Sequence, residues 1–179
     1  MKNLLYHSLA GTKSAELLLL LAKSAEKTFI TNEQISPDFS VANDLNTEDQ
    51  ESLIIAFPDN LNSSVNEVLD PCFEQIQRFV QIRMKKRFGQ ILCLINAGVN
   101  GLLYSDNYNT SSLSAQGGLV GLTKTVSKEY SKRGIIANVL YIDWDNMPLT
   151  EIASRSKHIL TDNTNLKGQV FALDGGKFL

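Results

Sequence analysis

The stretch GGLVGLTKTVSKEYSKRGIIANVLYID, Gly117 to Asp143, decides the fold of this chain. Its helix-forming residues predict a helix from Leu113 to Lys132, with Gly134 in the position that commonly ends a helix. The residues that follow, Ile136–Ile142, form an apolar run that predicts a buried strand. A helix that leads directly into such a strand is typical of a parallel sheet covered by helices.

The rest of the chain repeats this alternation. Strands are predicted at Asn3–His7, Thr28–Thr31, Leu53–Phe57, Gln90–Ile95 and Gln169–Leu173, and helices at Ser14–Lys23, Ser64–Lys86 and Thr150–Leu160. Ser14 is a candidate N-cap, and Pro71 should break or kink its helix near Asp70. Residues 35–46 and 96–112 are polar and predict loops. The pattern predicts one α/β domain, residues 1–179, with a parallel sheet and helices on both faces.

Charge argues against a nucleic-acid-binding protein. The chain has 179 residues and a formal net charge of -2, whereas nucleic-acid binding needs a concentrated basic face. The most basic cluster, Arg83, Lys85, Lys86 and Arg87, closes a predicted helix. Cations suit that end of the helix dipole, so the cluster has a structural explanation.

Neither a disulfide framework nor a metal site is expected. Cys72 and Cys93 are the two cysteines, and His7 and His158 lie near opposite ends of the chain. No Cys-x-x-Cys spacing is present. The apolar run Leu17–Ala22 is too short to cross a bilayer, and the first residues show no signal-peptide pattern. We therefore expect a cytoplasmic protein with no membrane segment.

Three segments resemble the short-chain dehydrogenases/reductases, especially the 3-oxoacyl-[acyl carrier protein] reductases. Gly117–Asp143 resembles the helix and strand that carry the family's catalytic Tyr and Lys. GQILCLIN, Gly89–Asn96, is similar to its fifth strand, Gly-Arg-Ile-x-x-Ile-x-Ser. LKGQVFALDGGKFL, Leu166–Leu179, resembles its final Thr-Gly-x-x-x-x-Val-Asp-Gly-Gly strand and turn. The resemblance implies a Rossmann-like doubly wound sheet; it is weak over Met1–Gln81.

The resemblance implies that the catalytic side chains are missing. The family's Tyr-x-x-x-Lys pair falls on Ser112 and Gln116, and its catalytic Ser falls on Asn96. The family's Tyr protonates the substrate carbonyl and its Lys holds both the phenol and the cofactor ribose. An Asn amide can bind a carbonyl but cannot replace the phenol. Tyr104 and Tyr108 lie upstream, but neither has a Lys four residues later.

The dinucleotide loop also departs from the family pattern. Its three glycines fall on Ser8, Thr12 and Ser14, while Gly11 is out of phase. Side chains at these positions narrow the space for a pyrophosphate, although Lys13 could offer a charge. No cofactor is expected; NADP(H) is the cofactor if the chain is an active reductase.

Two further family features are missing. The fourth strand ends in Pro58-Asp59 in place of Asn-Asn-Ala-Gly. After the sixth strand, Met147–Thr150 leads almost at once to the final segment. The substrate lid is therefore expected to be shortened.

Three functions remain open. The first is a catalytically inactive ketoreductase homologue that forms hetero-oligomers with an active 3-oxoacyl-carrier-protein reductase of a fatty-acid or polyketide-type pathway. Acyl carrier protein would then be an indirect partner, and self-association into a dimer or tetramer is also expected. The second is a diverged NADP(H)-dependent 3-oxoacyl reductase that retains activity. The third is a small module that binds another ligand in the vestigial cleft.

An association surface is expected on the two long helices. The candidate interface residues are Phe79, Leu119, Leu122, Val126 and Tyr130, because an exposed apolar face on a helix commonly marks an interface. The alternative is that these residues pack against the sheet. A helix of this length can do both.

Overall fold

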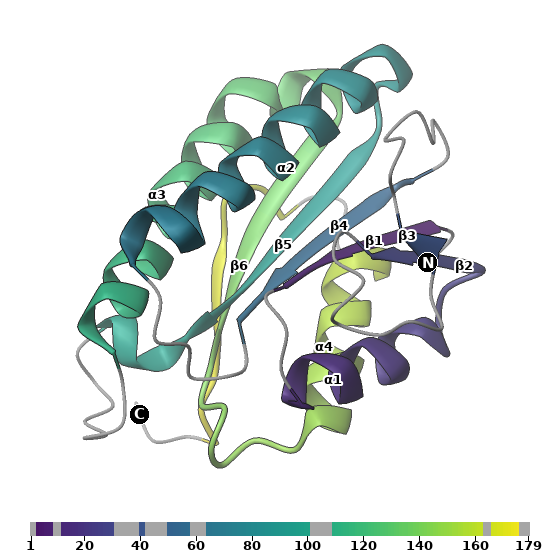
Figure 1. The fold of residues 1–179 in the computed structure, drawn as a ribbon. Coiled ribbons are helices and arrows are strands. Elements are labelled where there is room, and N and C mark those ends of the chain that lie inside the picture. Colours follow the sequence, from purple (N-terminus) through teal and green to yellow (C-terminus); the bar gives the residue numbers. More distant parts are fainter. Residues whose placement is uncertain are drawn as a thin grey trace.

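The sheet is a seven-stranded parallel sheet with the order β3-β2-β1-β4-β5-β6-β7 (Figure 1). The computed structural model describes residues 3–8, 12–30, 40–41, 50–57, 64–100, 109–162 and 166–175. The strands are β1 (Asn3–His7), β2 (Lys27–Ile30), β3 (Ser40–Val41), β4 (Ser52–Ala56), β5 (Gly89–Asn96), β6 (Ile135–Ile142) and β7 (Val170–Leu173). The predicted doubly wound α/β fold is confirmed.

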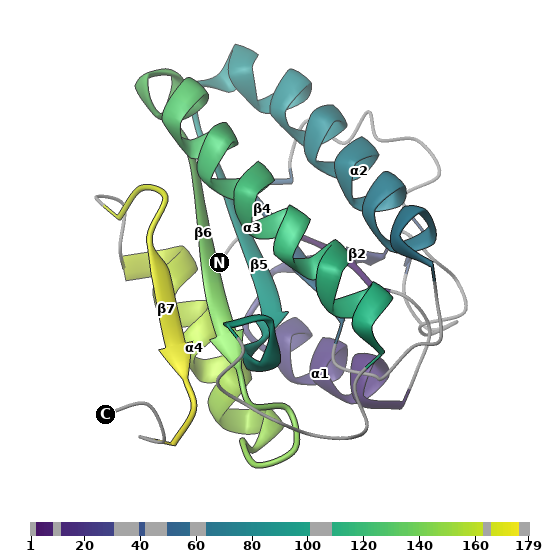
Figure 2. The ribbon, with the colours of Figure 1, turned by 90° about the vertical axis from the view of Figure 1, so that its left-hand side faces the viewer.

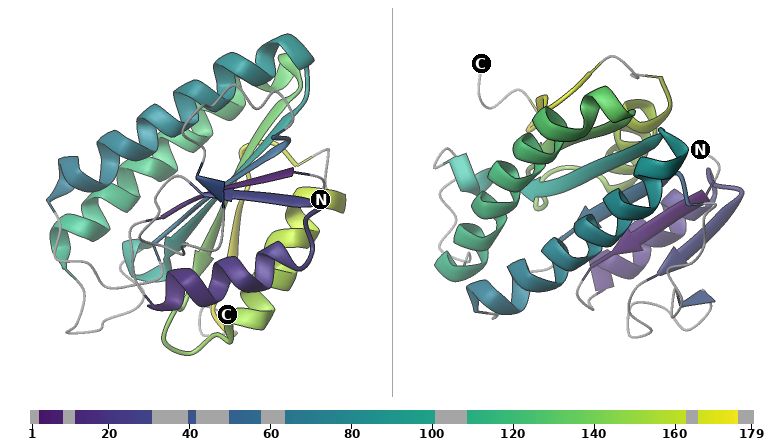
Figure 3. Two further views of the ribbon diagram at one scale, coloured as in Figure 1. Left: turned by 45° about the vertical axis from the view of Figure 1, so that its right-hand side comes forward. Right: turned by 90° about the horizontal axis from the view of Figure 1, so that it is seen from above.

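The four α-helices among the described residues cover the two faces of this sheet in pairs (Figures 1 and 2). Helices α1 (Thr12–Ala22) and α4 (Leu149–Asp162) lie on one face, and α2 (Val65–Lys86) and α3 (Thr110–Tyr130) lie on the other. Two short 3₁₀ turns, η1 (Ala97–Asn100) and η2 (Ser131–Arg133), follow β5 and α3. Figure 3 shows each helix pair running alongside the strands.

Each face of the sheet has its own apolar core, because successive side chains of a strand point to opposite faces. Leu53 and Ile55 of β4 pack in the core beneath α2 and α3. Ile54 and Ala56 pack in the core beneath α1 and α4. All four are fully buried, as expected for a strand covered on both sides.

Helix α2 is continuous through Pro71, so Pro71 does not break it, which was one of the two outcomes predicted there. A reciprocal capping box starts the helix: Ser64 Oγ accepts from the backbone N–H of Glu67, and the Glu67 carboxylate accepts from the backbone N–H of Ser64. Beyond Pro71, Cys72 and Ile76 are buried against the sheet. That burial stabilises the turn in which Pro71 removes one hydrogen bond.

Helix boundaries differ from the prediction at two N-termini. Helix α1 begins at Thr12, so Ser14 is a buried position inside the helix and not its N-cap. Helix α3 begins at Thr110, where the Asn109 side chain caps it by accepting from the backbone N–H of Ser111 at 2.8 Å. Both helices therefore begin earlier than the apolar pattern indicated.

The turn between η2 and β6 requires glycine, as predicted for Gly134. Its φ is +80°, and a Cβ there would lie 1.9 Å from the carbonyl oxygen of Arg87. The segment from residue 35 to 46, predicted to be a loop, contributes the short edge strand β3. Pairing with β2 explains that strand, which its polar sequence does not indicate.

Candidate functional site

The three catalytic positions implied by the sequence meet at the carboxyl end of β5. Asn96 ends that strand, and Ser112 and Gln116 lie one turn apart on α3. The Gln116 Oε1 atom accepts from the backbone N–H of Asn96 at 2.8 Å. The Gln116 Nε2 atom donates to Ser112 Oγ at 3.3 Å. All three residues are buried, so the structure brings them together as one polar cluster.

The side chains of this cluster are two amides, Asn96 and Gln116, and one hydroxyl, Ser112. The Asn96 Oδ1 atom accepts from the backbone N–H of Gly98 at 2.7 Å, so the carbonyl end of that amide is also part of the network. An amide and an aliphatic hydroxyl do not act as acids near neutral pH. The cluster contains neither a phenol nor a cation. Tyr104 and Tyr108 lie outside the described residues.

Neither cysteine offers a nucleophile. Burial raises the pKa of Cys93 to about 11, and it raises the pKa of Cys72 still further, with the neighbouring Cys93 as a second cause. Thr123 Oγ1 lies 3.1 Å from Cys93 Sγ and donates to the Leu119 carbonyl at 2.7 Å. Because the thiolate is the reactive form, both thiols serve as core residues.

The described part of the β1–α1 turn carries side chains at the positions that the resemblance assigns to the family's glycines. Ser8 Oγ and Ser14 Oγ are buried and lie 2.9 Å apart, so they hydrogen-bond to each other inside the turn. Thr12, at the second glycine position, is exposed at the first residue of α1. A β-branched side chain there takes the place of the bare backbone that lets phosphate approach closely. Gly11 lies outside the described residues.

Lys13 is engaged with another loop. Its ammonium donates to the Trp144 carbonyl at 3.3 Å and pairs with the Asp145 carboxylate at 3.4 Å. These contacts join the start of α1 to the β6–α4 turn, next to the place where a doubly wound fold normally holds phosphate. Sequence reasoning treated Lys13 as a possible phosphate ligand and missed this link, because its partners are distant in sequence.

Sequence reasoning also missed His7, which ends β1 next to Ser8. Burial lowers the pKa of His7 from 6.5 to about 4, because desolvation disfavours the charged imidazole. The imidazole meets the Phe57 ring edge-on, with centroids 6.4 Å apart. A neutral imidazole in this position packs as part of the core.

The connection from β6 to α4 is a short turn, Asp143–Pro148. The buried Asp143 carboxylate accepts two hydrogen bonds from Asn146 Nδ2, at 3.0 and 2.9 Å. The Trp144 side chain is buried among the apolar residues beneath α1 and α4. The turn is therefore anchored to the body of the domain.

The predicted interface residues divide into two groups. Phe79, Leu119 and Val126 are buried within the chain, with exposures of 3%, 0% and 6%, so the expectation that they form an exposed face is wrong. They belong to the core beneath α2 and α3, which was the alternative explanation, although Val126 also lines the groove between the two helices. Leu122 and Tyr130 are half-buried and line a groove between α2 and α3.

This α2–α3 groove has a volume of about 380 Å³ and a largely apolar lining. Its lining residues are Phe73, Ile76, Gln77, Val80, Gln81, Met84, Leu122, Thr125, Val126, Glu129 and Tyr130. Phe73, at 48% exposure, is among the most exposed large apolar side chains of the described residues. The sequence pattern did not indicate Phe73 as an interface residue; it favoured Phe79 on the same helix.

Other site classes find no support within the part of the chain that the structure describes. No group of three or more His, Cys, Asp or Glu residues there could hold a metal ion. No helix among those residues is long and apolar enough to cross a membrane.

Comparison with known proteins supports a reductase-like fold. No protein-family model matches the chain. Over 83 residues the chain is 36% identical to the 3-oxoacyl-[acyl-carrier-protein] reductase MabA of Mycobacterium avium. That match covers 44% of this chain and 31% of the reductase, so the chain is matched over about a third of its relative's length.

Two solved structures share the fold. An oxidoreductase of the short-chain dehydrogenase/reductase family from Burkholderia thailandensis has a TM-score of 0.74 and 14% identity, over 99% of this chain and 93% of that one. ElxO with NADP bound has a TM-score of 0.70 and 14% identity, over 98% of each chain. The resemblance to short-chain dehydrogenases/reductases is confirmed for the fold and for part of the sequence.

Proposed function

We propose that this chain is a catalytically silent relative of 3-oxoacyl reductases that assembles with an active ketoreductase. The observation that carries the proposal is the hydrogen-bonded cluster of Asn96, Ser112 and Gln116, which occupies the family's catalytic positions without an acid or a cation. The active partner would be a 3-oxoacyl-carrier-protein reductase of fatty-acid or polyketide-type synthesis. Acyl carrier protein would be met indirectly, through that partner.

The silent site follows from what carbonyl reduction needs. A proton donor must meet the substrate oxygen as hydride arrives, and a cation must hold both that donor and the cofactor. Here Gln116 directs its carbonyl oxygen at a backbone N–H, and Ser112 accepts from the same side chain. Among these three side chains, a ketone entering this site would therefore meet no group able to protonate it.

The α2–α3 groove is the proposed contact surface. Exposed apolar surface such as Phe73, beside half-buried Leu122 and Tyr130, is common at protein interfaces. A two-fold contact through these helices would bury the same groove on both partners, and a homologue could take the place of a second copy. Self-association into a dimer or tetramer uses the same surface.

Co-purification from the native cell tests the partner. The chain should be tagged at its own locus and purified without a crosslinker. We expect mass spectrometry to find a ketoreductase bound to it in stoichiometric amount. A strictly monomeric chain that retains no reductase would contradict the proposal and favour a ligand-binding module instead.

A matched pair of variants tests the surface. Phe73→Asp places a charge in the groove, whereas Ser114→Asp places the same charge on an exposed part of α3 outside it. We expect Phe73→Asp to dissociate the complex in light scattering and Ser114→Asp to leave it intact. Both should keep the helical circular dichroism of the parent. Equal behaviour of the two variants would show that the partner binds elsewhere.

The second candidate is a diverged NADP(H)-dependent 3-oxoacyl reductase, favoured by the similar fold of ElxO with NADP bound. Turnover of acetoacetyl thioesters with NADPH would support it. Tyr104→Phe and Tyr108→Phe should then be assayed, and a loss of turnover in either would identify the acid. The silent-relative proposal predicts no turnover, and none after Ser112→Tyr and Gln116→Lys are introduced together.

A further inference from the structure

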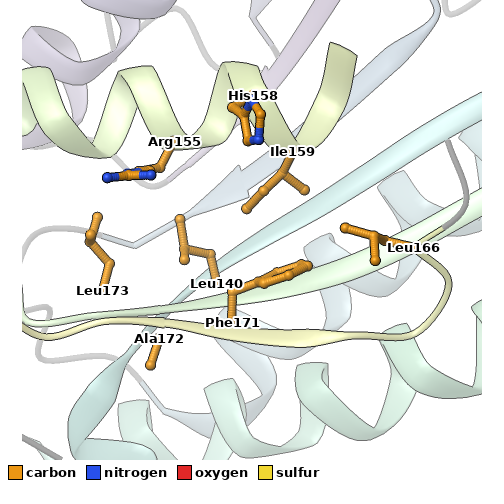
Figure 4. Close-up of a pocket in the computed structure, with 8 residues that line it drawn as sticks. All are labelled: Leu140, Arg155, His158, Ile159, Leu166, Phe171, Ala172 and Leu173. Carbon is orange, nitrogen blue, oxygen red and sulfur yellow. The ribbon is translucent and has the colours of Figure 1, made fainter. Parts of the chain in front are cut away.

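A cavity of about 430 Å³ lies between α4 and the edge of the sheet formed by β6 and β7 (Figure 4). It exists because α4 packs most closely against α1 and β5, which leaves space over the edge strand. It is separate from the cluster at Asn96 and from the α2–α3 groove, and its lining shares no residue with the groove. Its volume falls in the range of small-molecule sites.

The floor of the cavity is apolar. Leu140 of β6 is buried, and Phe171 and Leu173 of β7 are half-buried. These two β7 side chains face α4, while Ala172 points to the other side of the strand (Figure 4). Ile159 of α4 completes the apolar lining. An aliphatic chain lying here would remove this surface from water.

The helix side of the cavity carries Arg155 and His158 (Figure 4). Arg155 Nε donates to Glu151 Oε1 at 2.7 Å, and the two side chains are 59% and 39% exposed. That contact uses one of the five N–H donors of the guanidinium. The terminal nitrogens of a guanidinium suit a carboxylate, which they can bind through two parallel hydrogen bonds.

We propose that this cavity binds a small amphiphile with a medium-length aliphatic chain and a carboxylate head. The chain lies on Leu140, Phe171 and Leu173, and the head meets Arg155 at the rim. The positive charge of Arg155 above an apolar floor selects this class over neutral lipids and over polar metabolites. The proposal does not depend on the silent site or on the partner at the α2–α3 groove.

Calorimetric titration of the full chain with decanoate, decanol and decyl phosphate tests the proposal. Decanoate should bind with a one-to-one stoichiometry and more tightly than either of the other two. Leu173→Trp fills the floor and should abolish binding. Val170→Trp adds the same ring at an exposed position of β7 that does not line the cavity, and it should leave binding unchanged.

Variants of charged residues test the head group. The side chains of Arg155 and Glu151 are exposed, so we expect their replacement to leave the fold intact. Arg155→Gln should weaken decanoate binding about tenfold, since it removes a charge-assisted contact, and should leave decanol unaffected. Glu151→Gln should strengthen decanoate binding, because it removes a competing carboxylate. Arg78→Gln, exposed on α2, should have no effect.

Three results would overturn the proposal. One is an absence of decanoate binding at millimolar concentration. Another is decanoate binding that survives both Leu173→Trp and Arg155→Gln. The third is tighter binding of decyl phosphate or decanol, because it would remove the assignment of a carboxylate head.

Discussion

Helix α3 contributes to two regions of opposite character. Toward β5, Ser112 and Gln116 are buried and hydrogen-bonded into a closed cluster with Asn96. Toward α2, Leu122 and Tyr130 line an open apolar groove beside the exposed Phe73. The difference separates the two roles that such a helix can serve. The side chains toward β5 hydrogen-bond to one another, whereas those toward α2 leave apolar surface uncovered.

The largest expected loss of stability comes from removing the hydrogen bonds of the cluster formed by Asn96, Ser112 and Gln116. Gln116→Leu removes the acceptor of the Asn96 N–H and the donor to Ser112, which leaves buried polar groups unsatisfied. The free energy of unfolding should fall by about 3 kcal/mol. Urea denaturation followed by circular dichroism measures it.

Gln81→Leu is the matched control, because Gln81 is exposed at the groove. Its effect should stay within about 0.5 kcal/mol. Equal losses in the two variants would show that the cluster contributes no more to stability than a surface glutamine.

Acid should destabilise the chain through His7. Its folded pKa, about 4, lies below the ordinary 6.5, so the unfolded state binds a proton that the folded state excludes. The stability that depends on neutral His7 is therefore present above pH 6.5 and is lost as pH falls toward 4. The loss should approach about 1.4 kcal/mol per pH unit within that window.

The pH dependence has its own control. His7→Gln should flatten the stability profile between pH 6.5 and 4, whereas Ser114→Ala, at an exposed position of α3, should leave its slope unchanged. An unaltered slope in His7→Gln would mean that another group governs the acid sensitivity.

The smallest expected effect lies in the β1–α1 turn. Ser8→Ala and Ser14→Ala should each cost about 1 kcal/mol, and the double variant should cost less than their sum because the two hydroxyls share one hydrogen bond. Thermal unfolding of the parent chain, the two single variants and the double variant measures the coupling energy between the two hydroxyls. Strict additivity would show that the 2.9 Å contact contributes no coupling energy.

Much of the fold could be predicted from the sequence, because strands buried on both faces and long helices leave strong apolar patterns. GQILCLIN and IIANVLYI, the sequences of β5 and β6, are such strands. Helix starts were less predictable: Thr12 and Thr110 begin helices that apolar periodicity alone places later. Strand β3 depends on its neighbour and carries little local signal.

The candidate site was predictable to a similar degree. Resemblance placed Asn96, Ser112 and Gln116 at one point, and the structure brings them together. The sequence could not distinguish the buried Phe79 from the exposed Phe73, because both are apolar residues of one long helix and the sheet selects which one turns inward. The contact of Lys13 with Asp145 joins residues far apart in the chain, so no local pattern reports it.

Calorimetric titration of the purified chain with NADPH and with NADH tests most directly whether the chain has lost the cofactor binding that carbonyl reduction needs. The Ser8–Ser14 contact and the engaged Lys13 lead us to expect no measurable binding of either. A dissociation constant at or below roughly 10 μM, about -7 kcal/mol, would contradict the account.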